Sequence, residues 1–263
     1  MYRNNFYLLG VLRTLKERKS NLRRDGISKD DIDKLVERDR RSPIKYGQQV
    51  EETLQCSDYF IKNISDIRIE NAVQRFVNLI HGAKNLTPTR DETGLFNAST
   101  AALRSACLSR QVGAAIMDAI TTMARIAQVS TVGKTLYCTT YPCHNCARHI
   151  IAAGIKRVVY IEPYEKSLAE DLHGDSISHG EPAGDDISKV VFDNFEGTAP
   201  RRYAKFFGYN RPRKNQQGKS ITYDIRTSHH VDSQQLYSYT DFELKIVKDV
   251  TTKIGKEITL PPV

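Results

Sequence analysis

The most constraining feature of the sequence is residues 136–164, LYCTTYPCHNCARHIIAAGIKRVVYIEPY. Residues 136–139 predict a strand. Pro142 then predicts a helix start and Gly154 the end of that helix, because proline suits the first turn and glycine suits the position after the last. Residues 156–162 form an apolar run that predicts a second buried strand. The order strand, helix, strand predicts an α/β fold.

Two cysteines, Cys143 and Cys146, lie three residues apart at the start of this helix. Their spacing places both thiols on one helix face, near the positive end of the helix dipole. That end lowers the pKa of a thiol, and the thiolate is the form that binds a metal. The alternative is a pair of structural or incidental cysteines. The flanking strands and Pro142 favour a metal site.

Together these features resemble the cytidine and deoxycytidylate deaminase superfamily, whose signature combines H-x-E with P-C-x-x-C. The similarity is greatest to the bacterial anti-phage deoxycytidine nucleotide deaminases, in which a P-loop-kinase-like region precedes the deaminase. Three segments carry the resemblance: TLYCTTYPCHNCARHIIAAGIKRVVYIEPYEKS, TAALRSACLSRQVGAAI and APRRY.

The resemblance implies a partial P-loop-kinase-like segment followed by a cytidine-deaminase-like αβα sandwich that lacks part of its first half. It implies Zn²⁺ bound by Cys143 and Cys146, and a deoxycytidine nucleotide as substrate, with dCMP or dCTP converted to dUMP or dUTP in anti-phage defence. By resemblance, Tyr164 would lie near the substrate base, and Arg201 and Arg202 would meet the phosphates. A partly buried aromatic ring and a charged surface loop are the alternatives for these three residues.

One half of the family signature is missing from its expected place in the sequence. The family needs a histidine as third zinc ligand and, two residues later, a glutamate that carries protons. One histidine, His179, is followed two residues later by glutamate, Glu181, but this H-x-E lies after the P-C-x-x-C segment, whereas the family signature places it before. The other six histidines, His81, His144, His149, His173, His229 and His230, have no such glutamate. The first deaminase strand, residues 112–116, runs directly into the truncated catalytic helix at 118–128. We therefore expect no catalytic residue, weak or absent zinc binding, and little turnover, so the enzyme assignment rests on the family alone.

Composition and the resemblance divide the chain into four parts. The predicted parts are a truncated kinase-like α/β segment at 1–84, a linker at 85–94, a deaminase-like domain at 95–230 and a C-terminal extension at 231–263. The resemblance places the phosphate loop of the kinase-like region before residue 1. Further predictions are helices at 14–24, 29–41, 69–81 and 95–109, strands at 6–11, 59–64 and 190–195, a loop at 173–186, and a strand or helix at 242–247.

Charge and cysteine content restrict the partners. The net charge of +8 and the pI of about 9.2 fit a polyanion, either nucleic acid or nucleotide phosphate. Residues 201–226 hold eight Lys or Arg against one acid, which leaves a basic nucleic-acid-binding protein as an alternative function. A second alternative function is an inactive deaminase-fold module that binds nucleotide or a partner. The sequence also allows a homo-oligomer. Five cysteines fit a reducing cytoplasm, and no apolar run predicts a membrane span.

Overall fold

The computed structural model describes two β-sheets that share one of three buried hydrophobic clusters, the one that contains Phe60 and Val159. The described residues are 6–40, 50–104, 112–116, 130–164, 166–180, 189–208, 212–226, 228, 230–231 and 239–254. Helices and strands alternate along most of this chain, so the expected mixed α/β class is confirmed. Among these residues, no helix combines the length and apolar character that crossing a membrane requires.

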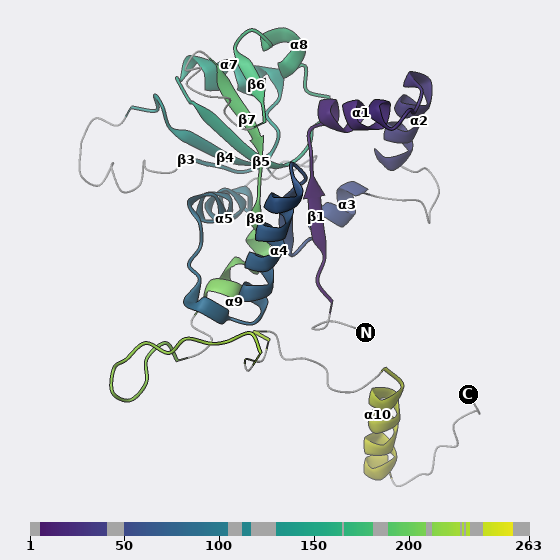
Figure 1. Ribbon diagram of the computed structural model, residues 1–263, viewed down its shortest axis with the longest axis vertical. Coiled ribbons are helices and arrows are strands. Elements are labelled where there is room, and N and C mark those ends of the chain that lie inside the picture. The colour runs from purple at the N-terminus through teal and green to yellow at the C-terminus, as the bar shows by residue number, and fades with distance from the viewer. Residues whose placement is uncertain are drawn as a thin grey trace.

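The larger sheet has five strands in the order β3-β4-β5-β7-β6 (Figure 1). Its strands are β3 (Ala114–Ile116), β4 (Thr135–Thr140), β5 (Arg157–Glu162), β7 (Val190–Asn194) and β6 (Ile177–His179). Only the edge strand β3 is antiparallel to its neighbour, and the other pairs are parallel. Parallel strands need crossover connections, and the helices that follow β4 and β5 supply them.

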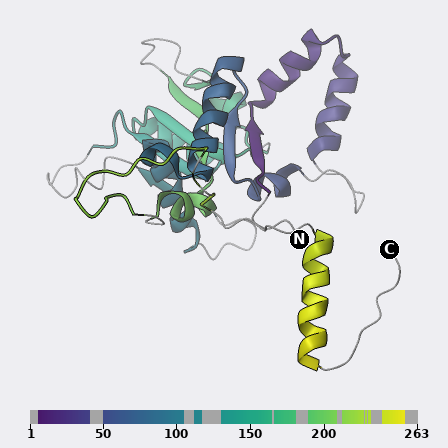
Figure 2. The same cartoon turned by 60° about the horizontal axis from the view of Figure 1, so that its bottom comes forward.

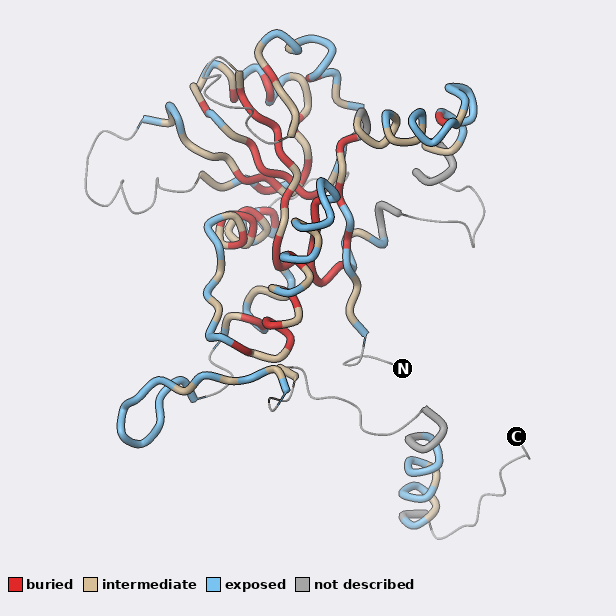
Figure 3. Tube along the Cα trace, in the orientation of Figure 1, coloured by how far each residue is buried: buried red, intermediate tan, exposed pale blue. Residues whose placement is uncertain are grey.

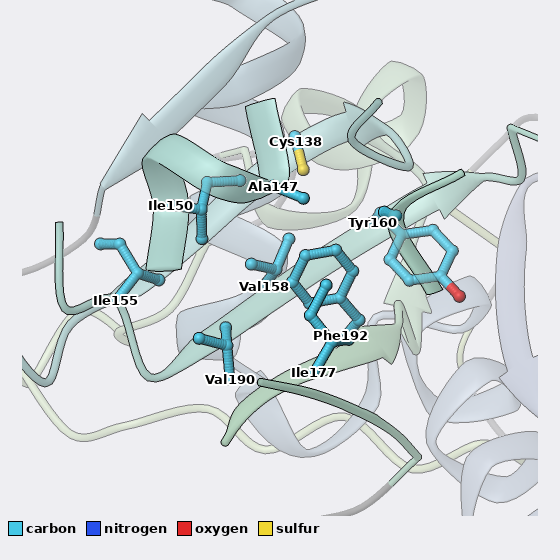
Figure 4. Close-up of a cluster of buried hydrophobic side chains, with 10 residues drawn as sticks. Cys138, Ala147, Ile150, Ile155, Val158, Tyr160, Ile177, Val190 and Phe192 are labelled. Carbon is cyan, nitrogen blue, oxygen red and sulfur yellow. The ribbon is translucent and has the colours of Figure 1, made fainter. Parts of the chain in front are cut away.

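Helices cover both faces of this sheet. On one face lie α7 (His144–Ala152) and α8 (Ala169–His173), over a buried cluster that includes Ile150, Val158 and Phe192 (Figure 4). On the other face lies α5 (Arg90–Ala102), whose Leu95 and Ala98 are fully buried. Because both faces are covered, β5 is apolar along most of its length and not alternating.

The smaller sheet has three strands drawn from distant parts of the chain. Strand β1 (Leu9–Leu12) is parallel to β2 (Tyr59–Lys62), and β8 (Gly197–Thr198) is antiparallel to β2. Helix α4 (Asp66–Ile80) packs on this sheet through Phe76 and its apolar neighbours. Two short helices, η2 (Pro200–Arg202) and α9 (Tyr203–Phe207), follow β8, and η1 (Ala83–Asn85) follows α4.

The remaining helices lie outside the two sheets. They are α1 (Leu15–Arg24), α2 (Lys29–Arg40), α3 (Val50–Gln55) and α10 (Tyr239–Ile254). Helices α1 and α2 extend from the end of β1, while α10 stands apart from both sheets in the two views (Figures 1 and 2). The segment predicted as a strand or helix at 242–247 is therefore part of a helix.

Two sequence predictions are corrected by these elements. Residues 90–94 of the predicted linker form the first turn and a half of α5, because Thr89 and Glu92 make a capping box. The Glu92 N–H donates to Thr89 Oγ1 at 3.1 Å, and the Thr89 N–H donates to the Glu92 carboxylate at 2.7 Å. The predicted loop at 173–186 contains strand β6, which pairs with β7.

A chain of buried charges connects the two sheets. Lys62 on β2 donates to Asp193 on β7 at 2.6 Å, and both side chains are nearly inaccessible. Figure 3 shows that buried residues gather along the central strands of the larger sheet. Arg157 on β5 bridges Asp193 at 2.7 Å and Asp91 at 2.9 Å. The Tyr137 hydroxyl donates to the same Asp91 carboxylate at 2.8 Å. These contacts join residues that the predicted domain boundary separates, and the four-part division itself stays a prediction.

Candidate functional site

The thiol pair lies where β4 ends and α7 begins. Cys143 is the residue before the first helical turn, with extended backbone angles of φ −69° and ψ 165°, and Cys146 lies within that turn. Cys143 is half-buried and Cys146 is exposed. The preceding Pro142 is buried, and its carbonyl accepts a hydrogen bond from the Ser167 hydroxyl at 2.7 Å. The structure therefore brings the two predicted ligands together at a helix start.

The two thiols differ in their acidity. The pKa of Cys143 is lowered, chiefly because the backbone N–H of Cys146 at the open end of the helix favours the thiolate. The pKa of Cys146 is raised, first because its sulfur is partly desolvated although the residue is exposed, and then by the neighbouring Cys143 sulfur, which competes as an anion. Such a pair ionises most readily at Cys143, as a metal-ligating thiol must.

The described residues do not complete a zinc site around this pair. Structural and catalytic zinc normally has four ligands, of which at least three come from the protein. Within the part of the chain that the structure describes, no group of three or more His, Cys, Asp or Glu side chains is placed to hold a metal ion. The truncated catalytic helix predicted at 118–128 lies outside the described residues.

Two nearby side chains, Cys138 and His149, are possible further metal ligands by their chemistry. Cys138 is buried in the core beneath α7, and burial raises the pKa of its thiol to about 12. Such a thiol is a weak metal ligand, because the thiolate is the form that binds a metal. His149 is exposed on the outer side of α7. Neither residue adds a third ligand to Cys143 and Cys146.

A cavity of about 610 Å³ contains the third predicted site residue, Tyr164. Its wall comes from β1, α1 and α2 on one side and from the ends of β5 and β7 on the other. Tyr141 and His179 also line it; their rings are stacked at 5.9 Å, and the Tyr141 hydroxyl lies 3.0 Å from His179 Nε2. Neither thiol of the pair lines this cavity.

The two predicted phosphate-binding residues have partners within the protein. Arg202 Nε donates to the buried Asp58 carboxylate at 2.6 Å, and its guanidinium lies over the Tyr7 ring. Arg201 contacts the same carboxylate and donates to the Ser57 carbonyl at 2.8 Å. Both arginines therefore fix the start of β2. The structure places them neither at the thiol pair nor in the cavity with Tyr164.

Sequence reasoning missed the residues that surround Tyr164. Arg13 lies in no motif, Tyr141 precedes the P-C-x-x-C segment and His179 begins an H-x-E that lies after it, so no single pattern joins these three distant segments. One signal was available. Each of these residues lies near the end of a strand, and ligand sites commonly form at the carboxyl ends of parallel strands. Strand β6, which carries His179, was not predicted, so that signal could not be used for it.

Comparison with known proteins identifies one segment. Residues 97–162 match the model of the cytidine and deoxycytidylate deaminase zinc-binding region. This range runs from α5 through the thiol pair to the end of β5. No match was found among curated proteins. The match covers a minor part of the chain and coincides with the elements that hold Cys143 and Cys146.

Solved structures give similarities at low sequence identity. The dCMP deaminase of cyanophage S-TIM5 in apo form is 19% identical, with 41% of this chain and 99% of that chain covered and a TM-score of 0.29. The same enzyme in complex with dCMP and dUMP is 19% identical, with 41% of this chain and 98% of that chain covered and a TM-score of 0.30. A structure from a study of tRNA:A34 deaminases is 20% identical, with 44% of this chain and 96% of that chain covered and a TM-score of 0.25.

Proposed function

We propose that this chain belongs to the lineage of zinc-dependent deaminases that hydrolyse deoxycytidine nucleotides in anti-phage defence, and that its own hydrolysis is impaired. One observation carries the proposal. The family match at residues 97–162 coincides with two thiols at the start of α7, one of which has a lowered pKa. A nucleotide substrate and a cytoplasmic location follow from the same resemblance.

The impairment follows from the residues that the chain lacks. Zinc, when bound in this family, supplies an activated water. Cys143 and Cys146 would be two of its ligands, but the described residues hold no third. The sequence also contains no H-x-E before the P-C-x-x-C segment, where the family signature has it, because its one such triplet, His179 to Glu181, comes after that segment. Loss of a general acid–base group costs about 10²–10⁴-fold in rate, so we expect turnover near background.

Two measurements on the purified chain test this proposal. Metal analysis should find well under one tightly bound zinc per chain. Ultraviolet assays with dCMP and dCTP should show uracil formation no faster than in the Cys143→Ser/Cys146→Ser variant, which lacks both thiol ligands. One zinc per chain together with uracil formation that the double variant abolishes would show an intact enzyme and overturn the proposed impairment.

The cavity beside Tyr164 favours a second candidate, an inactive deaminase-fold module that binds nucleotide. Its volume of about 610 Å³ lies within the range of small-molecule sites. Calorimetry with dCMP should then detect binding without turnover. No comparable observation favours a nucleic-acid-binding protein, because Arg201 and Arg202, which begin the basic stretch, are ion-paired with Asp58.

A further inference from the structure

The cavity lies where the carboxyl ends of parallel strands from the two sheets converge. Leu12 at the end of β1 and Asn63 after β2 line it from the smaller sheet. Ile161 near the end of β5 and Asn194 at the end of β7 line it from the larger sheet. Crevices outside the carboxyl ends of parallel strands are the usual place for ligands in α/β proteins. Here two such edges share one crevice, which α1 and α2 cover.

One end of the cavity carries two arginines. Arg13 follows β1, and Arg18 lies in α1. The Arg13 Nη1 group donates to the Asn63 carbonyl, while its Nε is buried without a hydrogen-bond partner. The Glu17 carboxylate lies 3.7 Å from that Nε, which is too far for a hydrogen bond. A buried donor without an acceptor requires an explanation, and a ligand oxygen would provide one.

The arginine side chains, and not the helix end, are the groups that can meet an anion here. The start of α1 is closed by its own capping box, in which the Glu17 N–H donates to Thr14 Oγ1 and the Glu17 carboxylate turns back to Thr14. The planar guanidinium group matches the oxygens of a phosphate. The basic end of the cavity therefore suits a phosphate group bound by side chains.

The other end of the cavity is aromatic. Tyr141 and His179 are stacked with an angle of 12° between their rings, and Tyr160 and Tyr164 complete this side of the wall. The Glu170 carboxylate at the same end lies 4.0 Å from His179 Nδ1 and adds a hydrogen-bond acceptor. Flat rings bind a planar base by stacking, and tyrosine hydroxyls and a carboxylate can meet its polar edge.

We propose that this cavity binds a nucleoside 5′-phosphate, with the phosphate at Arg13 and Arg18 and the base among Tyr141, Tyr164 and His179. The inference deepens the nucleotide-binding candidate above and rests on it. It assigns the phosphate to residues of β1 and α1, which lie outside the segment that matches the deaminase family. Neither Cys143 nor Cys146 takes part, so binding requires neither zinc nor turnover.

Equilibrium dialysis with dCMP and deoxycytidine tests the phosphate contact. Arg18→Gln should weaken dCMP binding about tenfold or more, the usual loss for a hydrogen bond to a charged group, and should leave deoxycytidine binding within twofold. Arg23→Gln is the matched control: the same change at an exposed position of the same helix, away from the cavity. It should change neither affinity.

Several outcomes would overturn the proposal. The first is that the unaltered chain does not bind dCMP at millimolar concentration. The second is that Arg18→Gln and Arg23→Gln weaken dCMP binding equally. The third is that Arg18→Gln weakens the binding of dCMP and of deoxycytidine equally. The Cys143→Ser/Cys146→Ser variant separates this site from the thiol pair. It should bind dCMP as the unaltered chain does. If the Cys143→Ser/Cys146→Ser variant loses dCMP binding and Arg18→Gln does not, the nucleotide lies at the thiols and the cavity proposal is wrong. Uracil formation by the unaltered chain would contradict the proposed impairment but would leave the cavity proposal standing.

The aromatic end needs a separate variant. Tyr164→Ala should weaken dCMP and deoxycytidine binding alike, by about fivefold to a hundredfold, because stacking on one side chain contributes about 1–3 kcal/mol to binding of a base. Its control is His149→Ala on the exposed side of α7, which should leave both affinities unchanged. Unchanged nucleoside affinity in Tyr164→Ala would place the base elsewhere.

Discussion

The Glu92 carboxylate is fully buried, and every hydrogen bond that it accepts fixes a different part of the fold. Arg75 of α4 donates at 2.7 Å, the Thr198 N–H of β8 at 2.8 Å and the Thr89 N–H at 2.7 Å. A single side chain thus connects the start of α5 with both α4 and the edge of the smaller sheet. Its sequence surroundings, TPTRDETG, gave the composition of a linker.

We predict that Glu92→Gln lowers the free energy of unfolding by about 3 kcal/mol. The amide keeps the volume but leaves the Arg75 charge without its buried counter-charge, and breaking a buried ion pair costs about 3–5 kcal/mol. Urea denaturation measures the change. Glu70→Gln, on the exposed side of α4, is the matched control and should cost under about 0.5 kcal/mol. Equal stability of the two variants would contradict this role for Glu92.

Asp91 gives the fold a dependence on pH. Burial alone would raise the pKa of its carboxyl, but the hydrogen bonds and charge of Arg157, aided by the Tyr137 hydroxyl, outweigh burial and lower it. A lowered pKa in the folded state stabilises the protein above the ordinary value of about 4, and this stability is lost as the pH falls below it.

Asp91→Asn should therefore flatten the acid side of the stability profile. The unfolding free energy of the unaltered chain should fall between pH 5 and pH 3, and that of Asp91→Asn should fall less. Thermal or urea unfolding across this range measures the slopes. Asp175→Asn, at an exposed position, should keep the slope of the unaltered chain. Identical slopes in all three proteins would show that Asp91 does not titrate with folding.

At the scale of elements, Gly94 allows α5 to pack closely on the larger sheet. A Cβ at Gly94 would lie 2.4 Å from the Tyr137 ring, far inside contact distance. Tyr137 is itself fully buried and cannot move aside without losing its bond to Asp91. The helix therefore approaches β4 more closely than any side chain would permit.

Gly94→Ala should destabilise the fold although alanine is the better helix former. Helix propensity favours the change by about 1 kcal/mol, whereas overpacking a core costs about 1–3 kcal/mol. We expect a net loss of about 1 kcal/mol in urea denaturation. Ser99→Ala in the same helix removes only a hydroxyl and should be near neutral. A more stable Gly94→Ala protein would mean that α5 does not pack this closely.

Elements with strong local signals could be predicted from sequence. Strands β4, β5 and β7 and helices α1, α2 and α7 lie within a few residues of their predicted ranges, because apolar runs, Pro142, Gly154 and cap residues mark them. The start of α5 was missed because the threonine and glutamate of a capping box also suit a linker. Strand β6 has three residues, and only its pairing with β7 defines it.

In the candidate site, too, the local part could be predicted from sequence and the part formed by distant segments could not. The thiol pair is local, so its spacing alone predicted that the two cysteines would meet. The cavity around Tyr164 brings together β1, α1 and the ends of β5 and β7, and no periodicity or motif records which strand ends converge. The family resemblance predicted that Arg201 and Arg202 meet the phosphates, but their partner Asp58 lies more than 140 residues away in sequence.

At the scale of the whole molecule, Lys62 and Asp193 make the two sheets depend on each other. Lys62→Met should lower the unfolding free energy by about 3 kcal/mol and leave a single transition. Urea unfolding followed by circular dichroism and by labelling of Cys138, buried beneath α7, should give one midpoint. Lys156→Met, at an exposed position before β5, is the control and should change little. Two separate midpoints would show that the sheets unfold independently.

Strand β8 has a consequence for how this protein can be divided. Only two residues long, it follows the whole larger sheet in sequence and yet completes the smaller one beside β2. A gene fragment that stops before residue 197 would encode β2 with one edge open to aggregation. A fragment that starts after residue 94 would carry β8 with nothing to pair with. No single cut of the chain between the two sheets therefore leaves each of them with all of its strands.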